Sequence, residues 1–156
     1  MASFIFTVKR RKMLRFDRRL LWNLGLLLLS SLAAADIEVE TPRLRLLPGD
    51  LPAAGYFSLS NTGDESAALV GADSATFGRV RMHQSIQENG VASMEPVPRL
   101  ELAPGETVEF APGGYHLMLM ERGQPLALGD EVTVTLEFED GRRTPVVFRA
   151  VSPASL

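Results

Sequence analysis

This 156-residue chain has only two histidines, and each is followed by a methionine a short distance along the sequence. Ten residues separate His83 from Met94, twenty-one separate Met94 from His116, and one separates His116 from Met118. Imidazole nitrogens and thioether sulfurs bind soft metal ions, and two of each suit Cu(I), which accepts a tetrahedral arrangement. Zinc prefers thiolate, carboxylate or further imidazole ligands, and calcium prefers oxygen. These four residues therefore indicate a copper site.

The run that begins at His116 alternates soft donors with leucines. Because side chains alternate faces along a strand, His116, Met118 and Met120 share one face of the expected strand. Leu117 and Leu119 point to the other face, which is expected to belong to the core. Met120 is therefore a fifth candidate ligand, farther along the strand.

A structural role is the alternative for each candidate taken alone. A single methionine on a strand usually fills the core, and Met82, of opposite parity to His83, is expected there. Tyr115 and Asn61 are expected to fix local structure rather than to bind metal. A purely structural role is a weaker explanation for the four residues together, because both histidines of the chain lie near methionines in the sequence.

Short alternating segments separated by turn residues run through most of the chain, and no segment has a helical period over ten residues. Asp140-Gly141 predicts a hairpin, and Pro42 predicts an edge strand or a bend. The expected strands are 37–47, 55–61, 67–72, 79–86, 91–97, 107–111, 115–120, 131–139 and 144–151. This pattern predicts an all-β protein, an antiparallel β-sandwich of about eight to nine strands.

The first 35 residues have the pattern of a signal peptide. A basic stretch precedes the apolar run 20–32, and three alanines end at Ala35. The apolar run is shorter than the roughly 20 residues that span a bilayer, so a retained anchor is the less favoured alternative. The sequence thus predicts an exported, periplasmic protein of a bacterium, with a leader (1–35) and one domain (36–156).

Cleavage at that point changes the charge of the chain. The remainder has nine arginines and no lysine against 18 acidic residues, a formal net charge of −9. Nucleic-acid and anionic-membrane binding need a basic surface, so neither is expected. A cation or a basic protein surface is the better partner.

The chain contains no cysteine, which excludes thiol catalysis, iron–sulfur clusters and cysteine-ligated copper centres. Hydrolase motifs such as G-x-S-x-G and H-E-x-x-H are absent from the sequence. With both histidines assigned to a metal, we do not expect an enzyme.

The pattern His-x10-Met-x21-His-x-Met resembles the PCuAC family of periplasmic copper chaperones. The surrounding text is also similar over most of residues 38–151, notably in 55–65, 78–97 and 100–120. This resemblance implies a cupredoxin-like β-sandwich that binds one Cu(I) per chain through the four motif residues. A monomer is expected. It further implies delivery of copper toward the dinuclear copper centre of cytochrome c oxidase, with a thioredoxin-like protein as a second partner.

Two alternatives remain open at this point. A metal-free, immunoglobulin-like interaction or assembly module would have the same strand pattern, and a copper storage or resistance protein would have the same ligands. The chain lacks the His- and Met-rich tail of some family members, which puts a second Cu(II) site in doubt.

The leader interpretation makes a direct prediction. N-terminal sequencing of the exported protein should begin at Asp36, because the three alanines provide the small residues that a signal peptidase requires. A first residue inside the leader would instead identify a retained anchor.

Overall fold

The computed structural model of the chain describes residues 36–156, and the leader interpretation of residues 1–35 lies outside them. None of the described residues forms a helix long and apolar enough to cross a membrane. Ten strands are followed by a short 3-10 turn, η1 (Pro153–Ser155). The strands are β1 (Ile37–Arg45), β2 (Ala53–Asn61), β3 (Ala67–Asp73), β4 (Phe77–Glu88), β5 (Val91–Pro96), β6 (Leu100–Leu102), β7 (Thr107–Phe110), β8 (Tyr115–Arg122), β9 (Glu131–Phe138) and β10 (Arg143–Val151).

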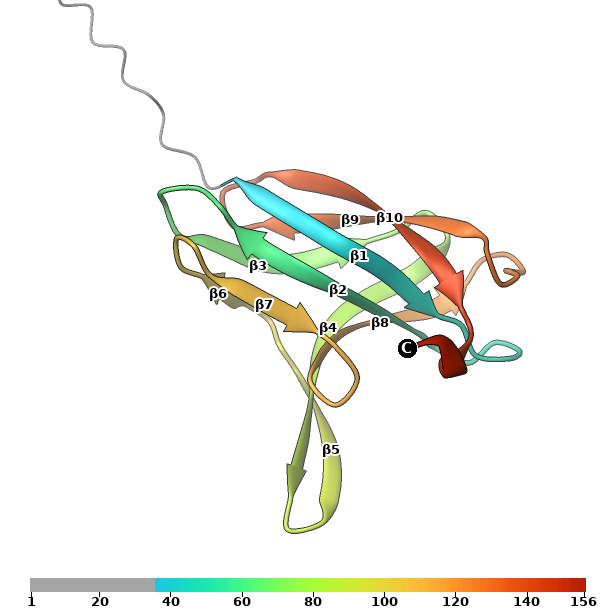
Figure 1. Cartoon of the computed structure of the whole chain (residues 1–156). Helices are drawn as coiled ribbons and strands as arrows, with labels where there is room; N and C mark the ends of the chain where they lie inside the picture. The colour runs from blue at the N-terminus through green and yellow to red at the C-terminus, as the bar shows by residue number, and fades with distance from the viewer. Residues whose placement is uncertain (1–35) are drawn as a thin grey trace, which may run out of the picture. The chain divides into compact units, whose positions relative to one another are not determined.

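The strands form one hydrogen-bonded ladder that folds back on itself (Figure 1). Its order is β5-β4-β8-β7-β2-β1-β10-β9-β3-β6, with β8 also paired to β2. β3 packs against β4 without hydrogen-bonding to it, so the two halves enclose a core as in a sandwich. The predicted all-β sandwich is confirmed. Two pairings, β1–β10 and β7–β8, are parallel, and the tenth strand is the three-residue β6.

An aromatic cluster fills the space between the layers. The Phe57 ring stacks on Phe110 at 4.2 Å between centroids, and Phe148 meets Phe57 edge-on at 5.5 Å. Gly55 allows β2 to approach β8 closely, because a Cβ there would lie 3.3 Å from both Leu117 and Phe148. These contacts hold β8 against the core along its inner face.

β1 bends at Pro42, as the second of the two sequence interpretations expects. Thr41 has a positive φ of 48°, and the register with β2 shifts between Glu40 and Arg43. β1 lies inside the ladder, so Pro42 does not mark an edge strand. Beyond the bulge, Leu44 is fully buried and Arg43 is exposed on the outer face.

β4 continues beyond the sandwich and forms, with β5, a projecting hairpin that we call the arm (residues 84–96; Figure 1). Its two strands pair from His83 outward. Asn89 and Gly90 have φ values of 52° and 79°, and positive φ at both central residues is the mark of a type I′ turn. Every residue of β5 is exposed.

A tight turn leads into β8. Pro112 and Gly113 are its central residues, Gly113 has a φ of 81°, and the N–H of Gly114 donates to the carbonyl of Ala111 at 3.0 Å. This is the arrangement of a type II turn. The carbonyl of Gly114 accepts the N–H of Ser85 at 3.0 Å, which ties the turn to β4.

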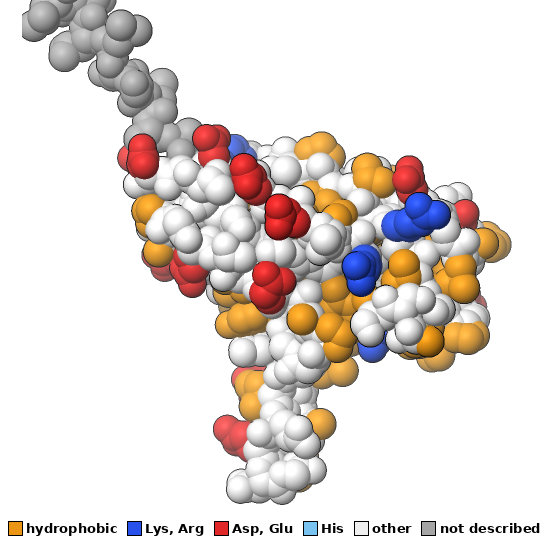
Figure 2. Space-filling view, viewed as in Figure 1, with side chains coloured by type: hydrophobic (Ala, Val, Ile, Leu, Met, Phe, Trp, Pro, Cys, Tyr) orange, Lys and Arg blue, Asp and Glu red, His pale blue; other side chains and the backbone are white. Residues whose placement is uncertain are grey.

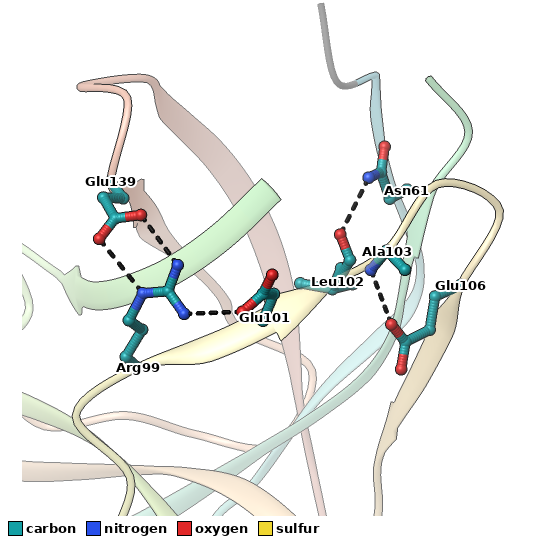
Figure 3. Close-up of polar contacts among 7 residues, drawn as sticks. All are labelled: Asn61, Arg99, Glu101, Leu102, Ala103, Glu106 and Glu139. Carbon is teal, nitrogen blue, oxygen red and sulfur yellow. Dashed lines mark hydrogen bonds and ion pairs between the residues drawn. The ribbon is translucent and has the colours of Figure 1, made fainter. Parts of the chain in front are cut away.

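Asn61, a candidate for a structural role, ties the end of β2 to β6 (Figure 3). Its buried side-chain nitrogen donates to the carbonyls of Leu102 at 3.2 Å and Glu65 at 2.7 Å. Its oxygen accepts the N–H of Gly63 at 3.2 Å. The expected structural role is confirmed, since a buried amide requires such partners.

The type II turn predicts different outcomes for its two glycines. Gly113→Ala should cost about 1–2 kcal/mol of unfolding free energy, because an L-residue is strained at positive φ. No atom lies within 4 Å of a Cβ at Gly113, so the cost would be conformational alone. Gly114→Ala is the control, since its Cβ would meet only the Ala111 oxygen, at 3.7 Å. Urea unfolding measures both, and equal losses would contradict the turn assignment.

Candidate metal centre

The two histidines face each other across β4 and β8. His83 is directly opposite His116 in the antiparallel register, and their rings lie nearly parallel with centroids 5.9 Å apart. Their sequence neighbours Met82 and Leu117 are also opposite each other, on the inner face, and both are buried. The core position expected for Met82 is confirmed, and the histidines share the outer face.

Met118 extends this pair along β8. It lies opposite Arg81, two residues from His83 on the same face of β4, so Met118 is a diagonal neighbour of His83. Both side chains are half-buried. Met120 lies opposite Arg79, about 6.6 Å farther along the strand at the usual rise per residue. Met120 is therefore on the expected face but one step removed from the histidines.

Met94 comes from the arm and lies on the other side of His83. Its partner in the β4–β5 register is Ser85, which again shares the face of His83. The residue is 59% exposed. All four motif residues thus lie on one face of three adjacent strands, with a thioether on each side of the histidine pair. Convergence of the four donor atoms on one ion stays a prediction.

The turn before β8 orients His116. Its ring is 5% exposed, and Nδ1 lies 3.2 Å from the carbonyl oxygen of Gly114. A ring nitrogen can bond a carbonyl oxygen only if it carries a proton to donate. This contact therefore places the proton of the neutral ring on Nδ1 and leaves the lone pair of Nε2 available. Burial lowers the pKa of His116, and the nearby His83 and Arg45 lower it further. The hydrogen bond to the Gly114 carbonyl raises this pKa, but the net shift is downward. The neutral ring is the form that binds metals.

His83 has a buried ring nitrogen with no hydrogen-bond partner in the described part of the chain, its Nδ1. A buried polar atom without a partner costs free energy that a ligand would recover. Residues 36–156 contain no group of three or more His, Asp or Glu side chains arranged to hold a metal ion. The register places the thioethers of Met94 and Met118 beside the histidine pair.

Two arginines next to these donors were not anticipated from the sequence. Arg45 lies over the Tyr56 ring at 5.5 Å and close enough to His116 to affect its pKa. One row of residues on adjacent strands crosses this face: Arg45, Ala54, Met118 and Arg81. Alternation in the sequence places Arg45 on an outer face, but only the β1-β2-β8-β4 order shows which side chains it meets.

Comparison with known sequences gives a family. The model named LpqE-like ("Putative lipoprotein LpqE-like") matches residues 37–150. A protein of Leifsonia xyli subsp. xyli, "Putative lipoprotein Lxx21020", is 36% identical over 94 residues, which are 60% of this chain and 57% of that protein. "Uncharacterized protein RP573" of Rickettsia prowazekii is 39% identical over 88 residues, 56% of this chain and 49% of that protein. The match thus spans about half the length of these relatives.

Solved structures agree with the fold and with the resemblance in sequence. The copper-bound PCuAC domain from PmoF2 has a TM-score of 0.64 at 28% identity, covering 77% of this chain and 97% of that one. Its apo form has a TM-score of 0.62 at 30% identity, with 77% and 94% covered. The Cu(I) form of DR1885 from Deinococcus radiodurans has a TM-score of 0.60 at 28% identity, with 80% and 83% covered. The chain therefore belongs to the LpqE-like family, and its sandwich is a PCuAC-type domain.

Proposed function

We propose that this protein is an exported metallochaperone that binds one Cu(I) ion through His83, Met94, His116 and Met118. The observation that carries the proposal is the facing histidine pair with a thioether at a diagonal position on each side. The Nε2 lone pair of His116 and the unpartnered Nδ1 of His83 are nitrogens available for coordination.

Copper in its reduced state fits these donors best. Thioethers are soft and neutral, and they favour Cu(I) over the harder divalent ions. Neutral imidazoles complete the set without requiring a carboxylate. Two similar structures are a copper-bound PCuAC domain from PmoF2 and the Cu(I) form of DR1885, which supports the same cargo here.

Release follows from the same donors. Neutral ligands leave the ion its positive charge, so an acceptor with thiolate ligands offers stronger donors and takes the ion by stepwise exchange. Met94 is the ligand at which exchange begins, because it is the most exposed of the four and lies on the projecting arm. His116 is the last ligand to be exchanged, because it is buried and contacts the Gly114 carbonyl.

The acceptor in this proposal is a copper protein of the bacterial cell envelope. The resemblance to PCuAC chaperones favours the dinuclear copper centre of cytochrome c oxidase as the destination, with a thioredoxin-like protein as a second partner. The lipoprotein names of the family model and of the Leifsonia relative support an exported location. Copper storage would use the same site without an acceptor.

The methionines provide the test of the proposal. Met94→Ala and Met118→Ala should each weaken Cu(I) binding by at least about tenfold, since even a residue that only supports a ligand contributes 10–100-fold. Cu(II) binding should fall much less, because a soft thioether matters most to the softer ion. Competition titrations with chromophoric chelators under anaerobic and aerobic conditions measure the two affinities.

Met120→Ala is the matched control, as it removes a thioether from the same face and strand. It should leave Cu(I) binding within about twofold of the unmodified chain, a change of less than 0.5 kcal/mol. Equal losses for both oxidation states in the Met94 and Met118 variants would make these methionines structural. No bound copper in native mass spectra would favour the metal-free interaction module instead.

A further inference from the structure

The arginines of residues 36–156 divide into two groups. Four form ion pairs, and each of these lies against a carboxylate on the sandwich surface: Arg79 with Glu121, Arg99 with Glu101 and Glu139 (Figure 3), Arg142 with Asp140, and Arg143 with Asp73 and Glu137. The others form no ion pair within the described residues, and four of them share the outer face that carries the copper-binding candidates. These four are Arg43, Arg45, Arg81 and Arg149.

The register brings these four side chains around the donor cluster. Arg43 and Arg149 are directly opposite each other on the parallel strands β1 and β10, and both are exposed. Arg45 and the exposed Arg81 are the two outer members of the row described above, and Met118 lies between them. We call these four residues the arginine face.

Carboxylates of the same surface form no ion pair with the arginine face within the described residues, although Glu131 of β9 is directly opposite Arg149. Glu109 bonds the Ser58 hydroxyl at 2.7 Å, and Glu121 pairs with Arg79. Glu38 and Glu40 precede the bulge of β1. Figure 2 shows acidic side chains gathered toward the start of β1, and toward its end basic side chains next to a hydrophobic area, with an acidic side chain directly beside them. Despite the net charge of −9, four arginines without ion pairs within the described residues share this surface, which favours an acidic partner over the basic one expected from the net charge.

This arrangement has costs that the fold and the cargo do not explain. Like charges directly opposite on neighbouring strands destabilise a sheet, and Arg43 is opposite Arg149, which has Glu131 as its partner on the other side. Positive charges near the site also oppose the binding of a copper cation. A binding partner that the arginines attract would account for both costs. Such a partner has to be negatively charged.

We infer that the arginine face docks a copper-exchanging protein whose own metal site is surrounded by carboxylates. Arginine forms bidentate bonds with carboxylates, and complementary charge speeds encounter and sets orientation. Docking would neutralise the arginines and align the two metal sites with the exposed Met94 between them. The inference rests on the proposed copper transfer and adds the chemistry of the partner.

The experiment compares two variants of equal charge. Arg43→Gln, Arg81→Gln and Arg149→Gln together alter the arginine face but spare Arg45, which approaches His116. Three replacements among the ion-paired arginines form the control: Arg99→Gln, Arg142→Gln and Arg143→Gln. Each protein is loaded with one equivalent of Cu(I). The acceptors are peptides with one Cys-x-x-Cys segment flanked by glutamates, serines or lysines, and stopped-flow absorbance follows transfer.

The unmodified chain should transfer copper to the glutamate peptide about tenfold faster than to the lysine peptide at low salt, the lower end of electrostatic rate enhancement. Added salt should reduce this ratio. The arginine-face variant should lose the preference while binding Cu(I) equally or more tightly. The control variant should keep the preference.

Three outcomes would overturn the inference. A ratio near one in the unmodified chain, or the same ratio in both variants, refutes docking while leaving Cu(I) binding intact. The unmodified chain and the control variant could sediment with phosphatidylglycerol vesicles while the arginine-face variant does not. If the unmodified chain then shows no peptide preference, the face binds a membrane instead. Absence of Cu(I) binding in the unmodified chain refutes the proposed function itself and the inference with it.

Discussion

The pairing of β4 with β8 is the constraint on which the site depends. Met82 and Leu117, and likewise Val80 and Leu119, are opposite each other and buried, so the core holds the register of the two strands. A slip by one residue would move every inward side chain to the outer face. The apolar residues thus fix, from the inner face, which polar residues meet on the outer face. Nothing in the imidazoles or thioethers themselves has to assemble the site.

Local features of the site were accessible from the sequence because they depend on near neighbours. Alternation placed His116 and Met118 on one face of the strand, as the register shows. Strand neighbours were not accessible in this way. β6 has only three residues, and the parallel β1–β10 pairing joins segments about a hundred positions apart. The four motif residues were grouped by the donor chemistry of their side chains and by resemblance to a family, and the register explains how they share a face.

The arginine face shows the same limit for charge. Acidic residues outnumber basic ones two to one in residues 36–156, and this sum does not reveal that four arginines share the face of the copper-binding candidates. The bulge at Thr41 separates Glu40 from Arg43 along β1, and the β10 pairing adds Arg149 to the basic end. Charge is a local property of a surface, and here it follows from a bulge and a parallel strand that composition does not reveal.

The arm gives the molecule two levels of local stability. A two-stranded hairpin without a core of its own is marginal in water, whereas β8 is held by neighbours on both sides and by buried leucines. Separation of β5 from β4 breaks the hydrogen bonds between these two strands and leaves the sandwich closed. Amide protons near Met94 therefore exchange with solvent through small local openings, and those of Leu117 and Leu119 require the core to open. The thioether of Met94 thus moves on a faster timescale than the imidazole of His116.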